Sequence, residues 1–434
     1  MYDFFKKSIV FLLTWEARLV LSRYKPKVIA VTGSVGKTTT KDAIYATLSS
    51  TLHVRKSEKS FNSDIGVPLT ILGLENAWRN PFLWAFNLVQ GFALVIRRVP
   101  YPAWLVVEVG ADRPDDIRRI AKWLRPDIAV ITGVPDIPVH VEFFRSPDEL
   151  AHEKRALAEH VKEGGMLILN GDDARMVELC KEFKNVTTFG FGKQNRFSAS
   201  HQGILYEKGK AIGTRFRLVH SGLAIPVSII GALGRARTYA ALAAFAVAEV
   251  AGVESSSVTR ALAAWTPPPG RMRVIKGVNG STIIDDTYNS SPAAALSALE
   301  TLKEVKAPPS GGRRIAVLGD MLELGRYASE AHRSVGMRAA ACADMLLTVG
   351  FRSRAIGEAA LDARMPEANI REYEHTEARR VGQELRNEVR EGDIVLVKGS
   401  QSMRMERTVE ELMAEPEKAV ELLVRQEPEW LLKK

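Results

Sequence analysis

The sequence predicts an α/β protein with a central P-loop domain on a mostly parallel sheet, followed by a smaller Rossmann-like α/β domain. Short apolar runs alternate with helical patterns over most of the 434 residues, which is typical of βαβ units. A glycine-bounded turn joins the first apolar run to a helical pattern, and prolines at 267–269 interrupt the chain later. A chain of this length usually forms two or three domains.

These signals predict three segments. Residues 1–27 form an N-terminal amphipathic helix, residues 28–266 form the central domain with an apolar insertion at 78–100, and residues 267–434 form the C-terminal domain. The boundary near 266 follows from the proline run, which fits neither a helix interior nor a central strand.

The turn after the first apolar run, residues 28–32, has the layout of a phosphate cradle. It reads Gly-x-x-Gly-Lys-Thr, two residues shorter than the common phosphate loop, and the alternative is an ordinary strand–turn–helix connection. Backbone N–H groups and the helix N-terminus would hold phosphates, Lys37 would add a positive charge, and Thr38 would ligate Mg²⁺. The predicted ATP-binding residues here are Gly33, Ser34, Gly36, Lys37, Thr38 and Thr39.

Two apolar stretches flank this region. The first, within 2–23, predicts a helix that Pro26 ends, since a cleavage site typical of a secretory signal is lacking. The second, 81–96, is too short and too interrupted by polar residues to span a bilayer comfortably. The two alternatives are an interfacial helix, and two helices that pack on each other or on the core.

The next segments continue the α/β alternation. Residues 105–110 predict a buried strand with Glu108 at its end, where a carboxylate is well placed to bind Mg²⁺. Further strands are predicted at 127–132 and 166–170, and Ser146 is expected to cap a helix that runs to about 162. A β-rich part at 186–230 and a helix at 240–251 follow. Four apolar strands are predicted beyond the prolines, at 283–286, 315–320, 345–350 and 394–399.

Composition limits the possible classes. The net charge of +9 suits acidic ligands such as nucleotides or anionic lipids, and no nucleic-acid partner is expected. The two cysteines, Cys180 and Cys342, lie far apart, so neither a disulfide framework nor a zinc site is expected. This cysteine usage fits a protein of the reducing cytoplasm.

Several motifs together resemble the Mur ligase family of ATP-dependent amide-forming enzymes. They are Thr32 to Thr39, Asn62 with Gly66-Val67-Pro68, Glu108-Val109-Gly110, His140-Val141-Glu142, Lys154, Gly270-Arg271, Asp285 to Pro292, Leu318 to Gly325 with His332, and Val397 to Ser400. The resemblance extends from about residue 28 to the end. Within the family, the C-terminal motifs are most similar to those of the member that adds D-alanyl-D-alanine to a UDP-linked muramoyl tripeptide.

The resemblance implies a reaction through an acyl phosphate that uses ATP and Mg²⁺. The protein is expected to be a cytoplasmic monomer. It implies that Thr38 and Glu108 bind one Mg²⁺ and His140 a second. Asn289 and Tyr288 would contact adenine and ribose, and Arg271 would reach the phosphates from across the domain junction. Asp286 would orient Arg271 or a ribose hydroxyl, and Lys398 with Ser400 would meet the amino substrate or phosphate.

Lys154 resembles the lysine that the family carbamoylates with CO₂ to give another Mg²⁺ ligand. That reaction needs a neutral amine, hence a buried lysine or one beside other cations. Without the resemblance, the residues favour a helix-surface lysine paired with Glu149, Glu153 or Glu159.

The sequence also departs from the family. Members of this type have an N-terminal domain that binds the UDP-sugar, whereas residues 1–27 suffice for one helix. Ala236-Arg237 replaces the usual His-Asn pair. The apolar insertion is also outside the family pattern, and together with the N-terminal helix it suggests contact with the inner face of a membrane. The alternatives are a related ligase for a γ-glutamyl, folate-like or lipid-linked acceptor, and a non-catalytic ATP-binding regulator at the membrane.

Overall fold

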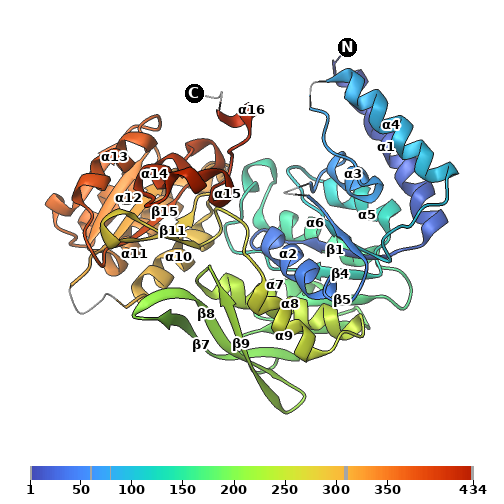
Figure 1. The fold of residues 1–434 in the computed structure, drawn as a ribbon, viewed down its shortest axis with the longest axis horizontal. Coiled ribbons are helices and arrows are strands. Elements are labelled where there is room, and N and C mark those ends of the chain that lie inside the picture. The colour runs from blue at the N-terminus through green and yellow to red at the C-terminus, as the bar shows by residue number, and fades with distance from the viewer. Residues whose placement is uncertain (1, 59–60, 79, 307–310, 432–434) are drawn as a thin grey trace.

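A computed structural model of the chain describes residues 2–58, 61–78, 80–306 and 311–431. Two α/β units, each on its own sheet, lie side by side (Figure 1). The chain ends and residue 79 of the predicted insertion lie outside the described residues. The predicted fold class is confirmed.

The described residues of the first unit form a nine-stranded sheet in the order β2-β3-β1-β4-β5-β6-β7-β8-β9. Neighbouring strands are parallel from β2 to β7 and antiparallel from there to β9. The strands are β1 (Lys27–Thr32), β2 (Val54–Lys56), β3 (Trp104–Glu108), β4 (Ile128–Ile131), β5 (Met166–Asn170), β6 (Val186–Gly190), β7 (Phe197–Glu207), β8 (Lys210–His220) and β9 (Leu223–Ile230). The β-rich part predicted at 186–230 is therefore confirmed.

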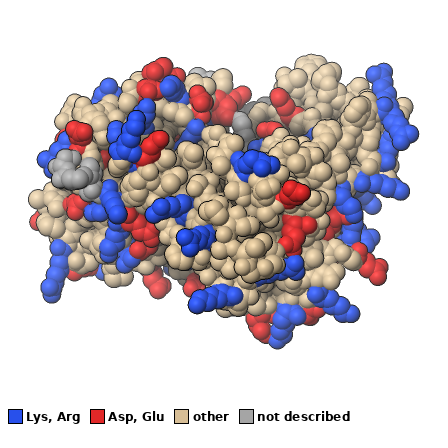
Figure 2. Space-filling view, turned by 60° about the horizontal axis from the view of Figure 1, so that its bottom comes forward, with Lys and Arg blue, Asp and Glu red and all other residues tan. Residues whose placement is uncertain are grey.

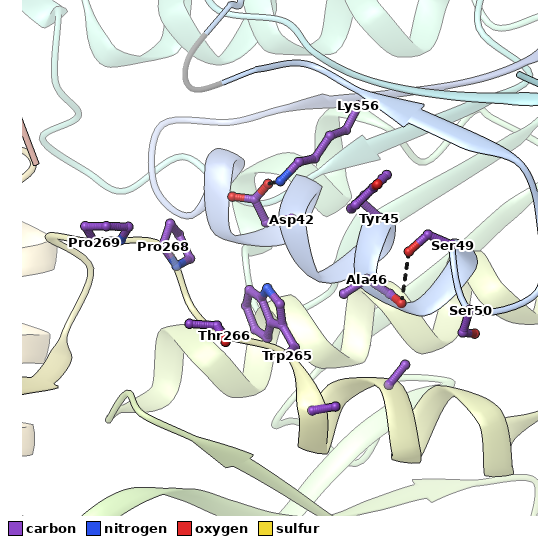
Figure 3. A pocket seen from close by; sticks show the side chains of 12 residues that line it. Asp42, Tyr45, Ala46, Ser49, Ser50, Lys56, Trp265, Thr266, Pro268 and Pro269 are labelled. Carbon is purple, nitrogen blue, oxygen red and sulfur yellow. Dashed lines mark hydrogen bonds and ion pairs between the residues drawn. The ribbon is translucent and has the colours of Figure 1, made fainter. Parts of the chain in front are cut away.

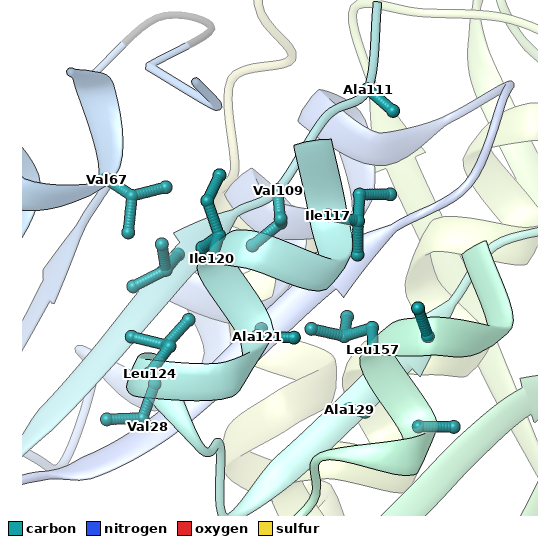
Figure 4. Packing of buried hydrophobic residues seen from close by; sticks show 14 of the residues in the cluster. Val28, Val67, Val109, Ala111, Ile117, Ile120, Ala121, Leu124, Ala129 and Leu157 are labelled. Carbon is teal, nitrogen blue, oxygen red and sulfur yellow. The ribbon is translucent and has the colours of Figure 1, made fainter. Parts of the chain in front are cut away.

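Helices cover both faces of this sheet because its central strands alternate buried apolar side chains between two cores. Val28 and Ala30 face the core with α1, α3, α5 and α6 (Figure 4), whereas Ile29 and Val31 face α2, α8 and α9. The helices are α1 (Tyr2–Tyr24), α2 (Lys37–Leu48), α3 (Gly66–Leu72), α4 (Pro81–Ile96), α5 (Asp116–Leu124), α6 (Pro147–Glu159), α7 (Ala174–Leu179), α8 (Arg235–Val250) and α9 (Ser255–Ala264).

The second unit has a six-stranded sheet in the order β10-β11-β15-β12-β13-β14, parallel except for β10. Its strands are β10 (Arg273–Lys276), β11 (Thr282–Asp286), β12 (Arg314–Gly319), β13 (Met345–Val349), β14 (Ile370–Tyr373) and β15 (Ile394–Lys398). Helices α10 (Pro292–Glu304), α11 (Ala328–Cys342) and α12 (Arg354–Asp362) pack on one face. Helices α13 (Ala378–Glu388) and α14 (Glu406–Leu412) pack on the other, followed by α15 (Ala419–Leu422) and α16 (Pro428–Leu431).

Three strands, β2, β10 and β14, were not predicted. Each lies at the edge of its sheet, has three or four residues and carries charged side chains, so it lacks the apolar run that predicts a central strand. Helix α8 begins at Arg235 rather than 240, and α6 ends at Glu159 rather than near 162. The cap predicted at Ser146 is confirmed, because its side chain accepts a hydrogen bond from the Glu149 N–H.

Candidate functional site

The phosphate loop joins β1 to α2 at the carboxyl edge of the large sheet. Gly33 and Gly36 both have positive φ, 141° and 84°, and Gly36 is the N-cap of α2. A Cβ at position 33 would overlap the Thr132 hydroxyl, so glycine is required there for close approach as well as for conformation. Thr132 Oγ1 donates to the Val35 carbonyl at 2.6 Å, which fixes the loop against β4.

Buried polar atoms without a hydrogen-bond partner gather around this loop. In the described residues they include Thr32 Oγ1, Ser34 Oγ and Glu108 Oε2. Since buried polar groups in folded proteins nearly always have partners, these atoms fit a site that is completed by a bound ligand. Lys37 meanwhile donates to the Gly33 carbonyl at 2.9 Å, and burial lowers its pKa despite nearby Glu108.

Arg271 brings the second unit to the loop. Its Nη2 donates to Thr38 Oγ1 at 3.2 Å, and its Cζ lies 3.9 Å from the centre of the Tyr288 ring. Tyr288 N–H in turn donates to the Gly270 carbonyl at 3.0 Å. The structure therefore brings together Arg271, Tyr288 and the loop at the domain junction, and their role in binding a nucleotide stays a prediction.

Arg237 is a further cation beside the loop, and the sequence analysis did not predict it as a site residue. Its side chain is 1% exposed, and Nη1 donates to Thr39 Oγ1 at 3.1 Å. Its Nε has no hydrogen-bond partner among the described residues. Burial lowers the pKa of Arg237 to about 10, with nearby Arg271 acting in the same direction. The exchange of Asn for Arg in the family motif was the signal that could have identified it.

Glu108 lies at the end of β3 with 1% exposure, as predicted. Its Oε1 accepts a hydrogen bond from Asn62 Nδ2 at 3.1 Å, and Oε2 is left without a partner. One carboxylate oxygen is thus held in place while the other is available, which suits a ligand to Mg²⁺.

His140 has a left-handed backbone, with φ 67°, and its ring faces the second unit. Nδ1 lies 2.7 Å from Glu323 Oε2, and Nε2 lies 3.8 Å from Asp112 Oδ1. The contact with His140 lowers the pKa of Glu323. Sequence reasoning did not assign a role to Asp112, which follows β3 by four residues and carries a negative charge close to Lys37 and Lys154.

Lys154 is buried, with 2% exposure, and its pKa is lowered to about 7, first by burial and then by Lys37. The alternative of a surface lysine paired with glutamates is wrong. Glu153 accepts backbone hydrogen bonds from residues 115, 117 and 118 and so caps α5. Glu149 accepts from the Arg145 N–H, and Glu159 pairs with Arg118 and Arg155.

Among the described residues, no hydrogen bond or ion pair joins the acidic pair at the end of β11 to the Arg271 side chain, although Asp286 accepts from the Met272 N–H. Asp286 Oδ2 lies 2.6 Å from Lys398 Nζ, and Lys398 also donates to the Asn289 carbonyl at 2.9 Å. Asp285 accepts hydrogen bonds from Gly270 and Thr287, and burial raises its pKa to about 6. Ser400 accepts from the Leu322 N–H. In this conformation Asp286 and Lys398 therefore form an ion pair with each other. Asp286 does not pair with Arg271, as one of the two predicted roles required.

The residues predicted to bind metal do not form a complete metal site in the part of the chain that the structure describes. Among the residues that the structure describes, no three His, Cys, Asp or Glu side chains converge as metal ligands. The predicted set of Thr38, Glu108, His140 and Lys154 contains only two such side chains. The free oxygen of Glu108 fits Mg²⁺, whereas Lys154 fits it only after conversion to a carbamate.

A separate hollow of about 600 Å³ lies between α2 and the connection to the second unit (Figure 3). It is lined by Tyr45, Trp265 and Pro268, and by Asp42, which is paired with Lys56 at 2.6 Å. None of the predicted site residues lines it, so it is a different surface from the phosphate loop.

Comparison with known proteins agrees with this arrangement. The Mur ligase middle domain matches residues 31–82 and 91–248, and the Mur ligase glutamate ligase domain matches residues 270–401. UDP-N-acetylmuramoyl-tripeptide--D-alanyl-D-alanine ligase from Bacillus subtilis is 28% identical over 92% of this chain and 79% of its own length. The protein of the same name from Synechocystis is 29% identical over 91% and 76%.

Solved structures show the same fold. MurF ligase from Thermotoga maritima in complex with ADP has a TM-score of 0.75 and 25% identity, covering 94% of this chain and 84% of that one. MurF from Acinetobacter baumannii has a TM-score of 0.73 and 24% identity, covering 92% and 79%. With both family domains matched in order, and with the phosphate loop of one in contact with the arginine of the other, the chain belongs to the Mur ligase family.

Proposed function

We propose that this protein is an ATP-dependent ligase that adds D-alanyl-D-alanine to a UDP-linked muramoyl tripeptide, a step of peptidoglycan precursor synthesis. The substrates come from the names of relatives that match over 90% of the chain. The structural observation that carries the proposal is the hydrogen bond from Arg271 to Thr38, because it joins both family domains at the phosphate loop. ATP as the nucleotide is supported by the ADP complex of the Thermotoga relative.

The reaction has two steps. A carboxylate oxygen of the tripeptide attacks the γ-phosphorus of ATP, the bond to the β–γ bridging oxygen breaks, and ADP leaves. The amine of D-alanyl-D-alanine then attacks the acyl carbon, the bond from that carbon to the phosphate oxygen breaks, and phosphate and a proton are released. Both steps concentrate negative charge, so positioned cations and N–H groups should supply most of the catalysis.

This chain's residues are suited to those demands. Lys37 and the loop around Gly36 would hold the β- and γ-phosphates, with Ser34 and Thr39 beside them. Arg271 would stabilise charge on the transferred phosphoryl group. Tyr288 and Asn289 would contact adenine and ribose. Asp286 and Lys398 would support the same wall of the cleft through their mutual ion pair.

Mg²⁺ would be held by Thr38 and Glu108, with His140 and carbamoylated Lys154 at a second position. When bound, it would neutralise phosphate charge. Carbamoylation joins the neutral Lys154 amine to CO₂ and releases a proton. It is supported by the burial and the lowered pKa of Lys154, since a substantial part of such an amine is neutral near pH 7.

The setting of the reaction is part of the proposal. We infer a monomer that works in the cytoplasm on small-molecule substrates. We also infer that the central and C-terminal domains meet between residues 266 and 267, which is supported by the change of sheet between β9 and β10.

The test is phosphate release from Mg·ATP with UDP-muramoyl-tripeptide, with and without D-alanyl-D-alanine, followed by the mass of the product. Release that needs both substrates, with a product heavier by the dipeptide less water, is expected. Lys37→Ala should abolish release, whereas Lys56→Ala, outside the loop, should not. ATP binding without release, or release with a different amine or acceptor, would overturn the assignment.

A further inference from the structure

Helices α1 and α4 lie side by side at the outer edge of the first unit, remote from the second (Figure 1). Their inward faces are buried, through Leu13 and Ala17 of α1 and Trp84 and Gly91 of α4. At their C-terminal ends, the Tyr24 hydroxyl donates to the Leu94 carbonyl at 3.1 Å. The pair is therefore a built part of the fold with one face fixed to the core.

The opposite face of this pair is apolar and faces solvent. We define the outer face by six side chains that are 44–84% exposed: Phe11, Trp15, Phe82, Phe86, Val89 and Phe92. On α4 these residues follow helical spacing and form one stripe, and the Trp15 and Phe92 rings stack at 6.4 Å, so the surface continues from one helix to the other. A continuous exposed apolar surface of this kind usually marks an interaction site.

Cations border the outer face. Lys7 and Arg18 lie one turn from Phe11 and Trp15 on α1, and Arg97 and Arg98 follow α4; all four are exposed. Among the side chains of α1 and α4 that the structure describes, the single acidic one is Glu16, which is buried. Figure 2 shows the blue side chains along the right-hand edge, where this pair of helices lies.

We propose that the outer face docks the protein on the surface of an anionic lipid bilayer. An apolar helix face bordered by Lys and Arg is the pattern of helices that lie in the membrane interface. Anionic head groups would neutralise the bordering cations and so strengthen binding. A second copy of the same face would instead bring cations against cations, which disfavours a symmetric dimer.

The dimensions also favour lying on the bilayer over crossing it. In the described part of the chain no helix is both long and apolar enough to span a membrane. The 16 residues of α4 extend about 24 Å, short of the roughly 30 Å hydrocarbon core.

The docking surface is separate from the ligase core. The Mur ligase middle-domain match omits residues 83–90 of α4, which include Phe86 and Val89, so this part of the stripe lies outside the family match. None of the outer-face residues is among those that we assign to the nucleotide site. The proposal therefore stands or fails independently of the substrate assignment.

The experiment is co-sedimentation of the full chain with vesicles of phosphatidylcholine alone or mixed 7:3 with phosphatidylglycerol. The variant F82S/F86S/V89S removes the apolar stripe, and R97E/R98E reverses the bordering charge. The matched control is F351S/V420S, because these side chains are 74% and 77% exposed on the second unit. Thermal unfolding and ADP binding of each variant check that the fold is intact.

We expect the wild type and the control to bind the anionic vesicles, with at least tenfold weaker binding to the neutral ones. The stripe variant should lose binding at least tenfold, and R97E/R98E severalfold, with a similar loss of wild-type binding in high salt. Equal recovery of wild type and stripe variant with the vesicles would overturn the proposal. The proposal would also be overturned if the wild type formed a dimer, the stripe variant were a monomer, and neither bound vesicles.

Discussion

Arg271 Nη2 lies 3.2 Å from Thr38 Oγ1, so a residue just before the second sheet reaches the first turn of the phosphate-loop helix. Both units thus contribute to one site. Arg271 Nε, which is buried, has no hydrogen-bond partner in the described part of the chain. The guanidinium is held by Tyr288 and Thr38 and has donor capacity left for a phosphate.

We predict that Arg271→Ala lowers kcat for phosphate release by about 10² to 10³, the usual cost of removing a positioned donor to developing charge. Arg271→Lys should recover only part of the loss, since an ammonium cannot reproduce the planar fork. Steady-state kinetics measure this, with Arg273→Ala as a control two residues away. Equal losses in the two alanine variants would argue against a catalytic role.

Lys154 gives a second prediction, on CO₂. Because its pKa is about 7, the neutral amine, and with it the carbamate, should increase as pH rises through 7. Activity in CO₂-depleted buffer at pH 6.5 should fall severalfold and return on adding bicarbonate. A carbamate signal with ¹³C-bicarbonate should appear in the wild type and be absent in Lys154→Met. Carbamoylation would be contradicted if activity did not change with CO₂ and the wild type gave no carbamate signal.

Some of the site could be predicted from sequence because its signals are local. A strand, a glycine turn and Lys-Thr define the phosphate loop within a few residues, and Glu108 ends an apolar run. The burial of Lys154 could not be derived from local patterns, because its surroundings come from distant parts of the chain: its neighbour Glu153 caps α5, more than thirty residues earlier, and Lys37 lies close enough to lower the Lys154 pKa.

Strand order limited the prediction in the second unit. Asp286 and Lys398 are direct neighbours in the register of β11 and β15, which are 112 positions apart in the chain. Nothing in a single sequence states that β15 lies beside β11, so the ion pair between them was missed. The short edge strands β2, β10 and β14 were missed for a different reason, since their charged side chains hide the strand pattern.

Arg237 gives a third prediction, because ligand binding and stability should respond oppositely. Arg237→Met keeps most of the volume and removes a buried cation for which the described residues provide no ion-pair partner. Such a replacement is often neutral or stabilising, so the melting temperature should stay the same or rise. If the guanidinium holds a phosphate, ADP affinity should fall about tenfold in calorimetry. Unchanged affinity with a lower melting temperature would make Arg237 a structural residue only.

The last prediction concerns Glu16, whose carboxylate is buried between α1 and α4 against Gly91, where a Cβ would overlap it. Its Oε2 has no hydrogen-bond partner among the described residues, and burial raises its pKa from 4.5 to about 7. The folded state therefore keeps a proton that the unfolded state loses above about pH 4.5. It follows that Glu16 makes stability fall as pH rises from about 4.5 to 7.

Glu16→Gln keeps the shape and removes this titration, so the variant should be more stable than the wild type at pH 8 and similar at pH 5. The expected difference between these two pH values is on the order of 2–3 kcal/mol. Denaturant unfolding at both pH values measures it, with Glu75→Gln as the control because Glu75 is exposed on the same unit. A constant difference between variant and wild type across this range would show that the Glu16 carboxyl finds a partner or water in solution, and that the interface of α1 and α4 is less closed than its contacts with Gly91 indicate.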